Sequence, residues 1–195
     1  NDMSPKALIE LSRKSNVGLK QKGGNSCWII SVVNGLLSTK RGGELLAKCF
    51  DDENTCVFQA RTLKGKAHPI KVAMSKVDDL LNTKQGKGLS KLEAAIWLGV
   101  CEMAKYPDEF GRVDTSKAGD IGEATQSAML LGLDNAVNGD GKSVSDNDSS
   151  WVIGANALHK GNVVVLHREG GNAGKHFLTA IGTTFKEDPK NGALE

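Results

Sequence analysis

Apolar residues recur at helical spacing through most of the chain and gather in short, strand-like runs near its end. The segment 27–37 is apolar on nearly all sides, which predicts a helix buried within a core. Ser4 and Ser90 are typical N-cap residues. They predict a helix over residues 4–14 and a second helix that ends before Pro107.

Weaker patterns predict the remaining elements. Helix-like spacing predicts helices over residues 42–50 and 120–131 and one or two helical turns over 76–81. Short apolar runs over 57–60 and 69–73 predict short strands, with extended loop as the alternative. The polar tract 138–150 predicts a surface loop or a boundary between lobes. Two later runs predict strands over 162–167 and 176–182, joined by the glycine-rich stretch 170–174. Helices first and strands last predict an α+β fold in a single domain, with a helical lobe over about 1–135 and a β-rich lobe over about 150–195.

Length and charge exclude several classes of protein. A chain of 195 residues with 39% apolar content can bury one sizeable core. Its 25 basic and 23 acidic residues leave a net charge of +2, so we expect no nucleic-acid partner. No apolar run approaches the roughly 20 residues of a membrane span, and we therefore expect a soluble protein.

The four cysteines are too sparse for a disulfide scaffold and lack the paired spacing of a zinc site. Cys49 and Cys56 are expected to be ordinary thiols, with a local bridge between them as the alternative. Cys101 lies in an apolar helical pattern and is expected in the core. The acidic residues of 138–150 do not fit the calcium-loop template, so neither a metal nor a cofactor is predicted.

Cys27 carries the strongest chemical signal. It opens the apolar helix, where the positive end of the helix dipole favours a thiolate anion. Gln21, six residues earlier, has an amide able to donate to an oxyanion beside the sulfur. Gly23 and Gly24 let a substrate approach the backbone closely, and Trp28 is expected in the core and the cleft wall. The alternative is that Cys27 is a buried core thiol that only packs.

A thiol nucleophile needs a base, and histidine is the usual choice. His176 is our candidate because it heads a strand directly after a glycine-rich segment, where a cleft can form. We expect His68, His159 and His167 to be surface or packing residues.

These residues carry a resemblance to a known family. The segment from Gln21 to Trp28, with Ser31 one helical turn later, resembles the active-site segment of papain-like cysteine peptidases. The strand over 176–182 resembles the one that bears the histidine of that family. Two segments between them, 92–105 and 119–132, are faintly similar to calpain-type cores.

The resemblance implies a papain-like two-lobe fold. Cys27 would lie on the central helix, His176 on the opposing sheet, and Gln21 in the oxyanion hole. The chain departs from the family at Gly24, where relatives usually carry a disulfide cysteine, and in lacking their Asn-Ser-Trp-Gly motif. The residue that orients the histidine is therefore open. Asp188 is the first candidate and Asn191 the second, and the alternative is that their segment is a plain turn.

The expected reaction is cysteine-dependent hydrolysis of a protein substrate, with peptide cleavage as the first reading. A glutamine deamidase, or a deubiquitinase-type effector acting on a host protein, uses the same chemistry and is the alternative. Short length and weak similarity outside the motifs favour a bacterial effector or toxin domain that acts in the cytosol of a target cell, with an inhibitor or immunity protein as a further partner. The non-enzymatic alternative is an inactive binding module of the same fold.

Overall fold

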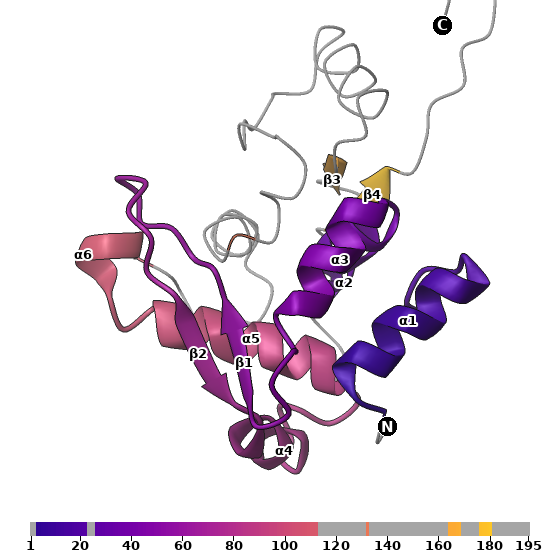
Figure 1. Ribbon diagram of the computed structural model, residues 1–195, viewed down its shortest axis with the longest axis horizontal. Coiled ribbons are helices and arrows are strands. Elements are labelled where there is room, and N and C mark those ends of the chain that lie inside the picture. The colour runs from indigo at the N-terminus through magenta and orange to yellow at the C-terminus, as the bar shows by residue number, and fades with distance from the viewer. Residues whose placement is uncertain (1–2, 23–25, 113–131, 133–163, 169–175, 181–195) are drawn as a thin grey trace, which may run out of the picture.

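The computed structural model describes residues 3–22, 26–112, 132, 164–168 and 176–180; for the last two ranges it describes the backbone, and the side chain of Trp28 is not described. The fold is mixed, with helices and small antiparallel sheets in the α+β class (Figure 1). The elements follow in the order α1 Pro5–Ser15, α2 Cys27–Leu37, α3 Lys40–Lys48, β1 Thr55–Phe58, β2 Ile70–Ala73, α4 Met74–Leu81, α5 Lys91–Met103, α6 Pro107–Phe110, β3 Val164–Arg168 and β4 His176–Ala180.

Side-chain caps fix the starts of three helices. The Ser4 hydroxyl accepts from the Ala7 N–H at the start of α1. Thr39 caps α3 in the same way. Ser90 and Glu93 form a reciprocal capping box at the start of α5. The caps predicted at Ser4 and Ser90 are confirmed.

The helix α2 is the centre of the core. Val33 and Leu36 have no exposed surface, and Ile29, Ile30 and Val32 are buried beside them. Burying each such side chain contributes about 1.5–3 kcal/mol before the entropy of ordering it is counted. The prediction that this apolar helix is buried is confirmed, and its ends are the predicted ones.

The strands β1 and β2 pair antiparallel, from Thr55 opposite Ala73 to Phe58 opposite Ile70. The helix α5 packs against β2 and α4, so this small sheet is covered by a helix (Figure 1). Alternate residues of β2 face the core, with Ile70 and Val72 buried. The strands expected over 57–60 and 69–73 are present with shifted ends.

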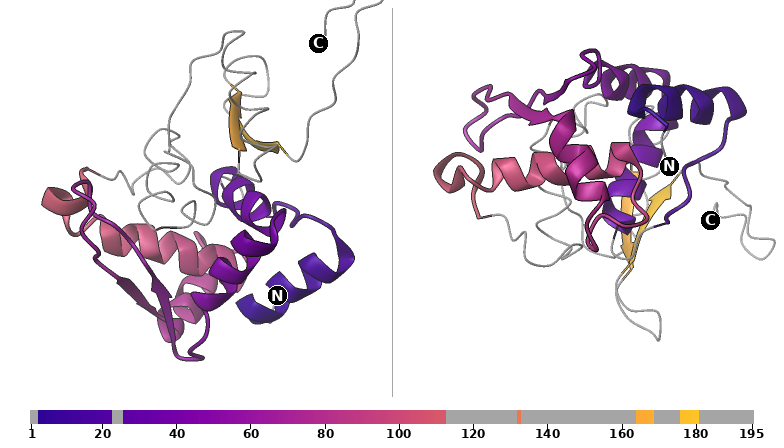
Figure 2. Two further views of the ribbon diagram at one scale, coloured as in Figure 1. Left: turned by 45° about the horizontal axis from the view of Figure 1, so that its top comes forward. Right: turned by 90° about the horizontal axis from the view of Figure 1, so that it is seen from below.

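The strands β3 and β4 form a second antiparallel pair, with Val164 opposite Ala180 and Arg168 opposite His176. This pair packs against α2, mainly through β4, as the two views of Figure 2 show. Both strands were predicted. The helix expected over 120–131, the loop over 138–150 and most of the proposed β-rich lobe lie outside the described residues.

Two details differ from the predictions. The helix α3 begins at Lys40 rather than at residue 42, because Thr39 supplies its cap. The short helix α6 was not predicted; it begins at Pro107, whereas α5 already ends at Met103. Within the described ranges, no helix is long and apolar enough to cross a membrane.

Candidate functional site

The N-terminus of α2 presents Cys27 as its first residue. Cys27 is half-buried, while Ser26 before it is buried. The Ser26 side chain makes no capping hydrogen bond, in contrast to the caps of α1, α3 and α5. The first helical bond here runs from the Ile30 N–H to the Ser26 carbonyl, 3.0 Å away. The backbone N–H groups of this first turn are therefore not capped by the Ser26 side chain. They point toward the N-terminal end of α2, where Cys27 is the first residue.

The segment that leads to Gln21 is fastened to the middle of α2. The Asn34 side chain accepts from the Leu19 N–H over 2.7 Å and donates to the Leu19 carbonyl over 3.1 Å. Gly18 lies so close that a Cβ on it would be 3.3 Å from Asn34. Gln21, two residues beyond this attachment, is half-buried. The chain between α1 and α2 is thus held along the helix that carries Cys27.

His176 is the first residue of β4, as the sequence predicted. Its backbone pairs with that of Arg168 in β3, and β4 packs against α2. The helix that begins with Cys27 and the strand that begins with His176 are therefore neighbours, although they are far apart in the sequence (Figure 2). The side chain of His176, and with it the sulfur-to-imidazole geometry, lies outside the described part of the structure.

Burial raises the pKa of the other three thiols, which favours their protonated form at neutral pH. Burial raises the pKa of Cys49 from 9.0 to about 12 and that of Cys101 to about 11. Burial also raises the pKa of Cys56, and the neighbouring Cys49 adds to this rise. Cys49 and Cys56 are free thiols, as expected, and both are buried. Cys101 is half-buried and packs at the edge of the core rather than within it, so its predicted core position is only partly met.

His68 has a structural environment. Its ring lies edge-on to Tyr106, with centroids 4.8 Å apart, and 5.1 Å from the ring of Phe110. Its Nδ1 atom is hydrogen-bonded to Glu109. These contacts tie the chain before β2 to α6, which agrees with the packing role predicted for His68. The side chain of His167 in β3 and all of His159 lie outside the described residues.

Several predicted site residues also fall outside what the structure describes: Gly23, Gly24, the Trp28 side chain, Asp188 and Asn191. Their roles stay predictions. Among the described residues, no group of three or more His, Cys, Asp or Glu side chains is placed to hold a metal ion.

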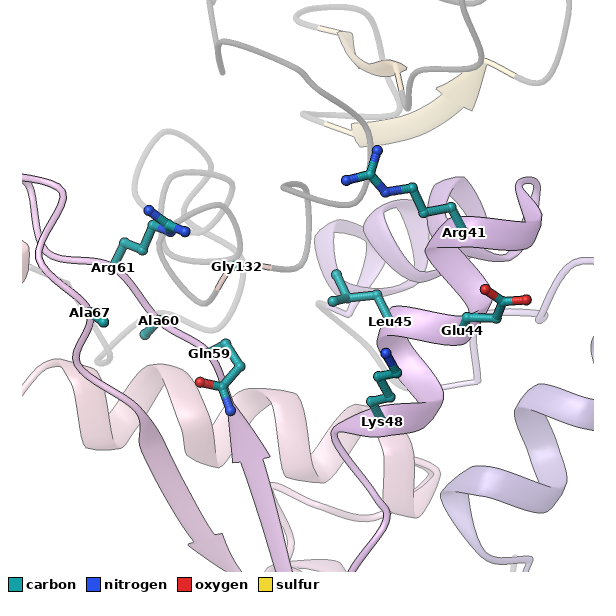
Figure 3. A pocket seen from close by; sticks show the side chains of 9 residues that line it. All are labelled: Arg41, Glu44, Leu45, Lys48, Gln59, Ala60, Arg61, Ala67 and Gly132. Carbon is teal, nitrogen blue, oxygen red and sulfur yellow. The ribbon is translucent and has the colours of Figure 1, made fainter.

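A second feature, which the sequence reasoning missed, is a basic hollow between α3 and the segment that follows β1 (Figure 3). It has a volume of about 330 Å³. Three of its lining residues are the cations Arg41, Lys48 and Arg61. The only signal in the sequence was that residues 41, 45 and 48 share one face of α3, a pattern that also fits an ordinary solvated surface.

No family model, curated protein or solved structure matches this chain. Support for a function therefore comes from the chemistry and placement of the described residues.

Proposed function

We propose that the protein is a cysteine hydrolase, and in the first instance a cysteine peptidase, with Cys27 as nucleophile and His176 as its base. The observation that carries the proposal is the packing of β4, which begins with His176, against α2, which begins with Cys27. The resemblance of both segments to papain-like peptidases supports the same pairing, and so a papain-like two-lobe arrangement is part of the proposal.

The proposed reaction has two halves. The Cys27 Sγ proton passes to the His176 imidazole, and the thiolate attacks the carbonyl carbon of the substrate amide. The electron pair of the carbonyl moves to its oxygen, where the Gln21 amide and the Cys27 backbone N–H donate hydrogen bonds. Collapse of this intermediate expels the amine, which takes the proton from His176. Water then gives a proton to His176 and attacks the thioester, releasing the acid, and Sγ recovers its proton.

The placement of Cys27 favours this role over a packing role. It stands at the positive end of a helix dipole, and it is half-exposed. Cys49 and Cys56, by contrast, are buried and have raised pKa values, and these are the properties of inert thiols. The attachment of Leu19 to Asn34 supports a fixed path for the chain that carries Gln21.

Asp188 completes the proposal as the residue that orients the His176 ring and stabilises its protonated form. Asn191 is the alternative for that position. The proposed substrate is a protein, and the proposed setting is an effector or toxin domain that acts in a target cell and is held in check by an inhibitor or immunity protein.

Selective alkylation tests the proposed pair. Wild-type protein is treated with a small excess of iodoacetamide at pH 7, and each cysteine peptide is quantified by mass spectrometry over time. We expect Cys27 to be modified at least about tenfold faster than Cys101, because only a trace of the Cys101 thiol, with its pKa of about 11, is ionised at that pH. His176→Ala should remove the excess reactivity of Cys27, while His68→Ala, a matched loss of a different histidine, should preserve it.

Equal labelling of Cys27 and Cys101, or an undiminished Cys27 rate in His176→Ala, would overturn the pairing. The reaction itself is tested on denatured casein with wild-type and Cys27→Ala protein. New peptide termini that depend on Cys27 support a peptidase. Conversion of glutamine to glutamate without cleavage would instead assign a deamidase with the same catalytic residues. If Cys27 is selectively labelled but casein is left unchanged, peptidase activity toward casein is contradicted.

A further inference from the structure

The basic hollow, defined above by its position between α3 and the segment after β1, is lined by two facing sets of side chains (Figure 3). Arg41, Leu45 and Lys48 come from α3, at positions that share one face of the helix. Gln59 and Arg61 come from the opposite side. The lining also includes Ala60, Ala67 and Gly132. Cations on two separate segments therefore border one concave space.

The charge of this lining is unbalanced. Among the described lining residues, Arg41, Lys48 and Arg61 are cations and Glu44 is the one anion. The Glu44 carboxylate lies 3.9 Å from the Nζ of Lys40, a residue outside the lining. Part of the negative charge of Glu44 is therefore neutralised by Lys40. Among the described residues, none of the three lining cations is within ion-pair distance of a carboxylate.

The segment that carries Arg61 is held in place by the backbone. Arg61 and Ala67 form a β-bridge, and the Thr62 N–H donates to the Lys66 carbonyl over 2.8 Å. The His68 N–H donates to the Ala60 carbonyl over 2.9 Å. These bonds fix the backbone on one side of the hollow, while α3 fixes the other. The backbone positions from which the lining cations extend are thus fixed around one hollow, and an anion bound there would be attracted by all three charges.

We propose that this hollow binds a small molecule that carries at least two phosphate charges, such as a phosphate ester or a diphosphate. Arginine forks match the oxygens of phosphate in pairs, lysine adds a point charge, and the Gln59 amide adds a neutral donor. Leu45 and Ala67 offer apolar surface to the carbon part of an ester. A volume of about 330 Å³ lies at the small end of the range for ligand sites, which favours a small ligand over a macromolecular surface.

Titration with inorganic pyrophosphate tests the site, with calorimetry and thermal unfolding of the full chain at constant ionic strength. Wild-type protein should bind with a stoichiometry near one and melt at a higher temperature in its presence. Arg61→Gln and Lys48→Gln should each weaken binding at least about tenfold, the loss expected for one charge-assisted contact. Lys64→Gln, which removes an equal charge from the same loop but outside the lining, should bind within about twofold of wild type.

Absence of pyrophosphate binding, or equal weakening by Lys64→Gln and Arg61→Gln, would overturn the site. Equally tight binding of citrate would overturn the assignment to phosphate. The three charge variants change exposed side chains, and circular dichroism shows whether each variant is folded before it is titrated. Cys27→Ala should bind pyrophosphate as wild type does, so the result is independent of the proposed hydrolase activity.

Discussion

The side chain of Asn34 holds the backbone of Leu19 at two points, accepting its N–H over 2.7 Å and donating to its carbonyl over 3.1 Å. An amide side chain in this arrangement takes the place of a strand partner for one residue. Asn34 is one of two polar residues with a side-chain hydroxyl or amide in the mainly apolar helix α2, and these bonds offset the cost of half-burying its amide. The connection between α1 and α2 is consequently fixed to the same helix that presents Cys27.

Replacing Asn34 with alanine should release this connection. We expect a loss of about 1–3 kcal/mol in the free energy of unfolding, because the half-buried Leu19 amide and carbonyl lose their partner. Chemical denaturation measures the loss. The control is Asn82→Ala, which removes an exposed bond of the Asn82 amide to the Asp78 carbonyl and should cost no more than about 0.5 kcal/mol.

The proposed hydrolase activity adds a second readout for Asn34. If the Leu19 attachment positions Gln21, Asn34→Ala should lower kcat and leave KM nearly unchanged in a folded sample. The reason is that the oxyanion forms only after the substrate is bound. An unchanged kcat in a folded but destabilised variant would show that the attachment serves stability alone.

The serine caps Ser90 and Ser4 should contribute different amounts to the free energy of unfolding, because Ser90 is buried and Ser4 is exposed. At the start of α5, the Ser90 N–H and Oγ both donate to Glu93 Oε2 over 2.8 Å, and both residues are buried. Within the described residues, Glu93 Oε1 has no partner, so the loss of one donor leaves this carboxylate poorly satisfied. Ser90→Ala should therefore cost about 2–3 kcal/mol.

The cap of α1 is the matched comparison. Ser4 is exposed and makes one bond to the Ala7 N–H, 3.2 Å away. Ser4→Ala should cost about 0.5–1 kcal/mol, since water replaces the lost acceptor. Equal losses in the two variants, measured by the same denaturation curves, would contradict a special role of burial at Ser90.

Neighbouring glycines in α3 should respond to alanine with opposite signs. A Cβ at Gly42 would lie 2.3 Å from the Leu36 carbonyl oxygen, which is backbone and cannot move aside. The three atoms nearest to a Cβ at Gly43 would all belong to the exposed, flexible side chain of Arg13, from 2.8 Å. Gly42→Ala should destabilise the protein by about 1–3 kcal/mol. Gly43→Ala should stabilise it by up to about 1 kcal/mol through helix propensity.

Thermal unfolding of the two glycine variants, side by side, measures the difference. A melting temperature that rises in both would mean that α3 shifts freely against Leu36. A fall in both would mean that Arg13 cannot turn away.

Buried thiols should make stability depend on pH in the alkaline range. In the unfolded chain Cys49 ionises near its ordinary pKa of 9.0, whereas in the folded protein burial raises that pKa to about 12. Between these values the folded state holds a proton that the unfolded state has lost. Stability is therefore fully present below pH 9 and falls as the pH rises toward 12, by at most about 1.4 kcal/mol per pH unit for one thiol.

Denaturation curves at several pH values from 8 to 11 measure this slope. Cys49→Ala should lower stability throughout, through its cavity, and should also flatten the alkaline slope. The other alkaline groups are present in both proteins, so the difference between the two slopes reports the Cys49 thiol together with its effect on the pKa of Cys56. Parallel slopes would show that Cys49 is already as accessible when folded as when unfolded.

Local signals predicted most of the described fold, and they did so where one residue acts on its neighbours. Ser4 and Ser90 are caps because a hydroxyl reaches the N–H three residues on, and that distance is fixed by the helix itself. The apolar run of α2 could only be buried. The helix α6 escaped prediction because its four residues are held by longer-range contacts, among them the bond from the Leu63 N–H to the Glu109 carbonyl.

In the candidate site, too, local patterns predicted some features and missed those that depend on distant segments. Cys27 at a helix start and His176 at a strand start were read from local patterns, and both positions are confirmed. The role of Asn34 and the basic hollow were missed, since each depends on segments brought together by tertiary packing. The signal for the role of Asn34 was an amide side chain within a mainly apolar helix. Nothing local distinguishes Arg61 from other exposed arginines.

The burial of α2 from Ile29 to Val33 links the end that bears Cys27 to the rest of the core. A helix packed in this way resists local fraying, because its central turns open only when the core opens. Loss of Cys27 reactivity on heating should therefore coincide with cooperative melting instead of preceding it. The reactivity of Cys27 then reports whether the molecule is folded.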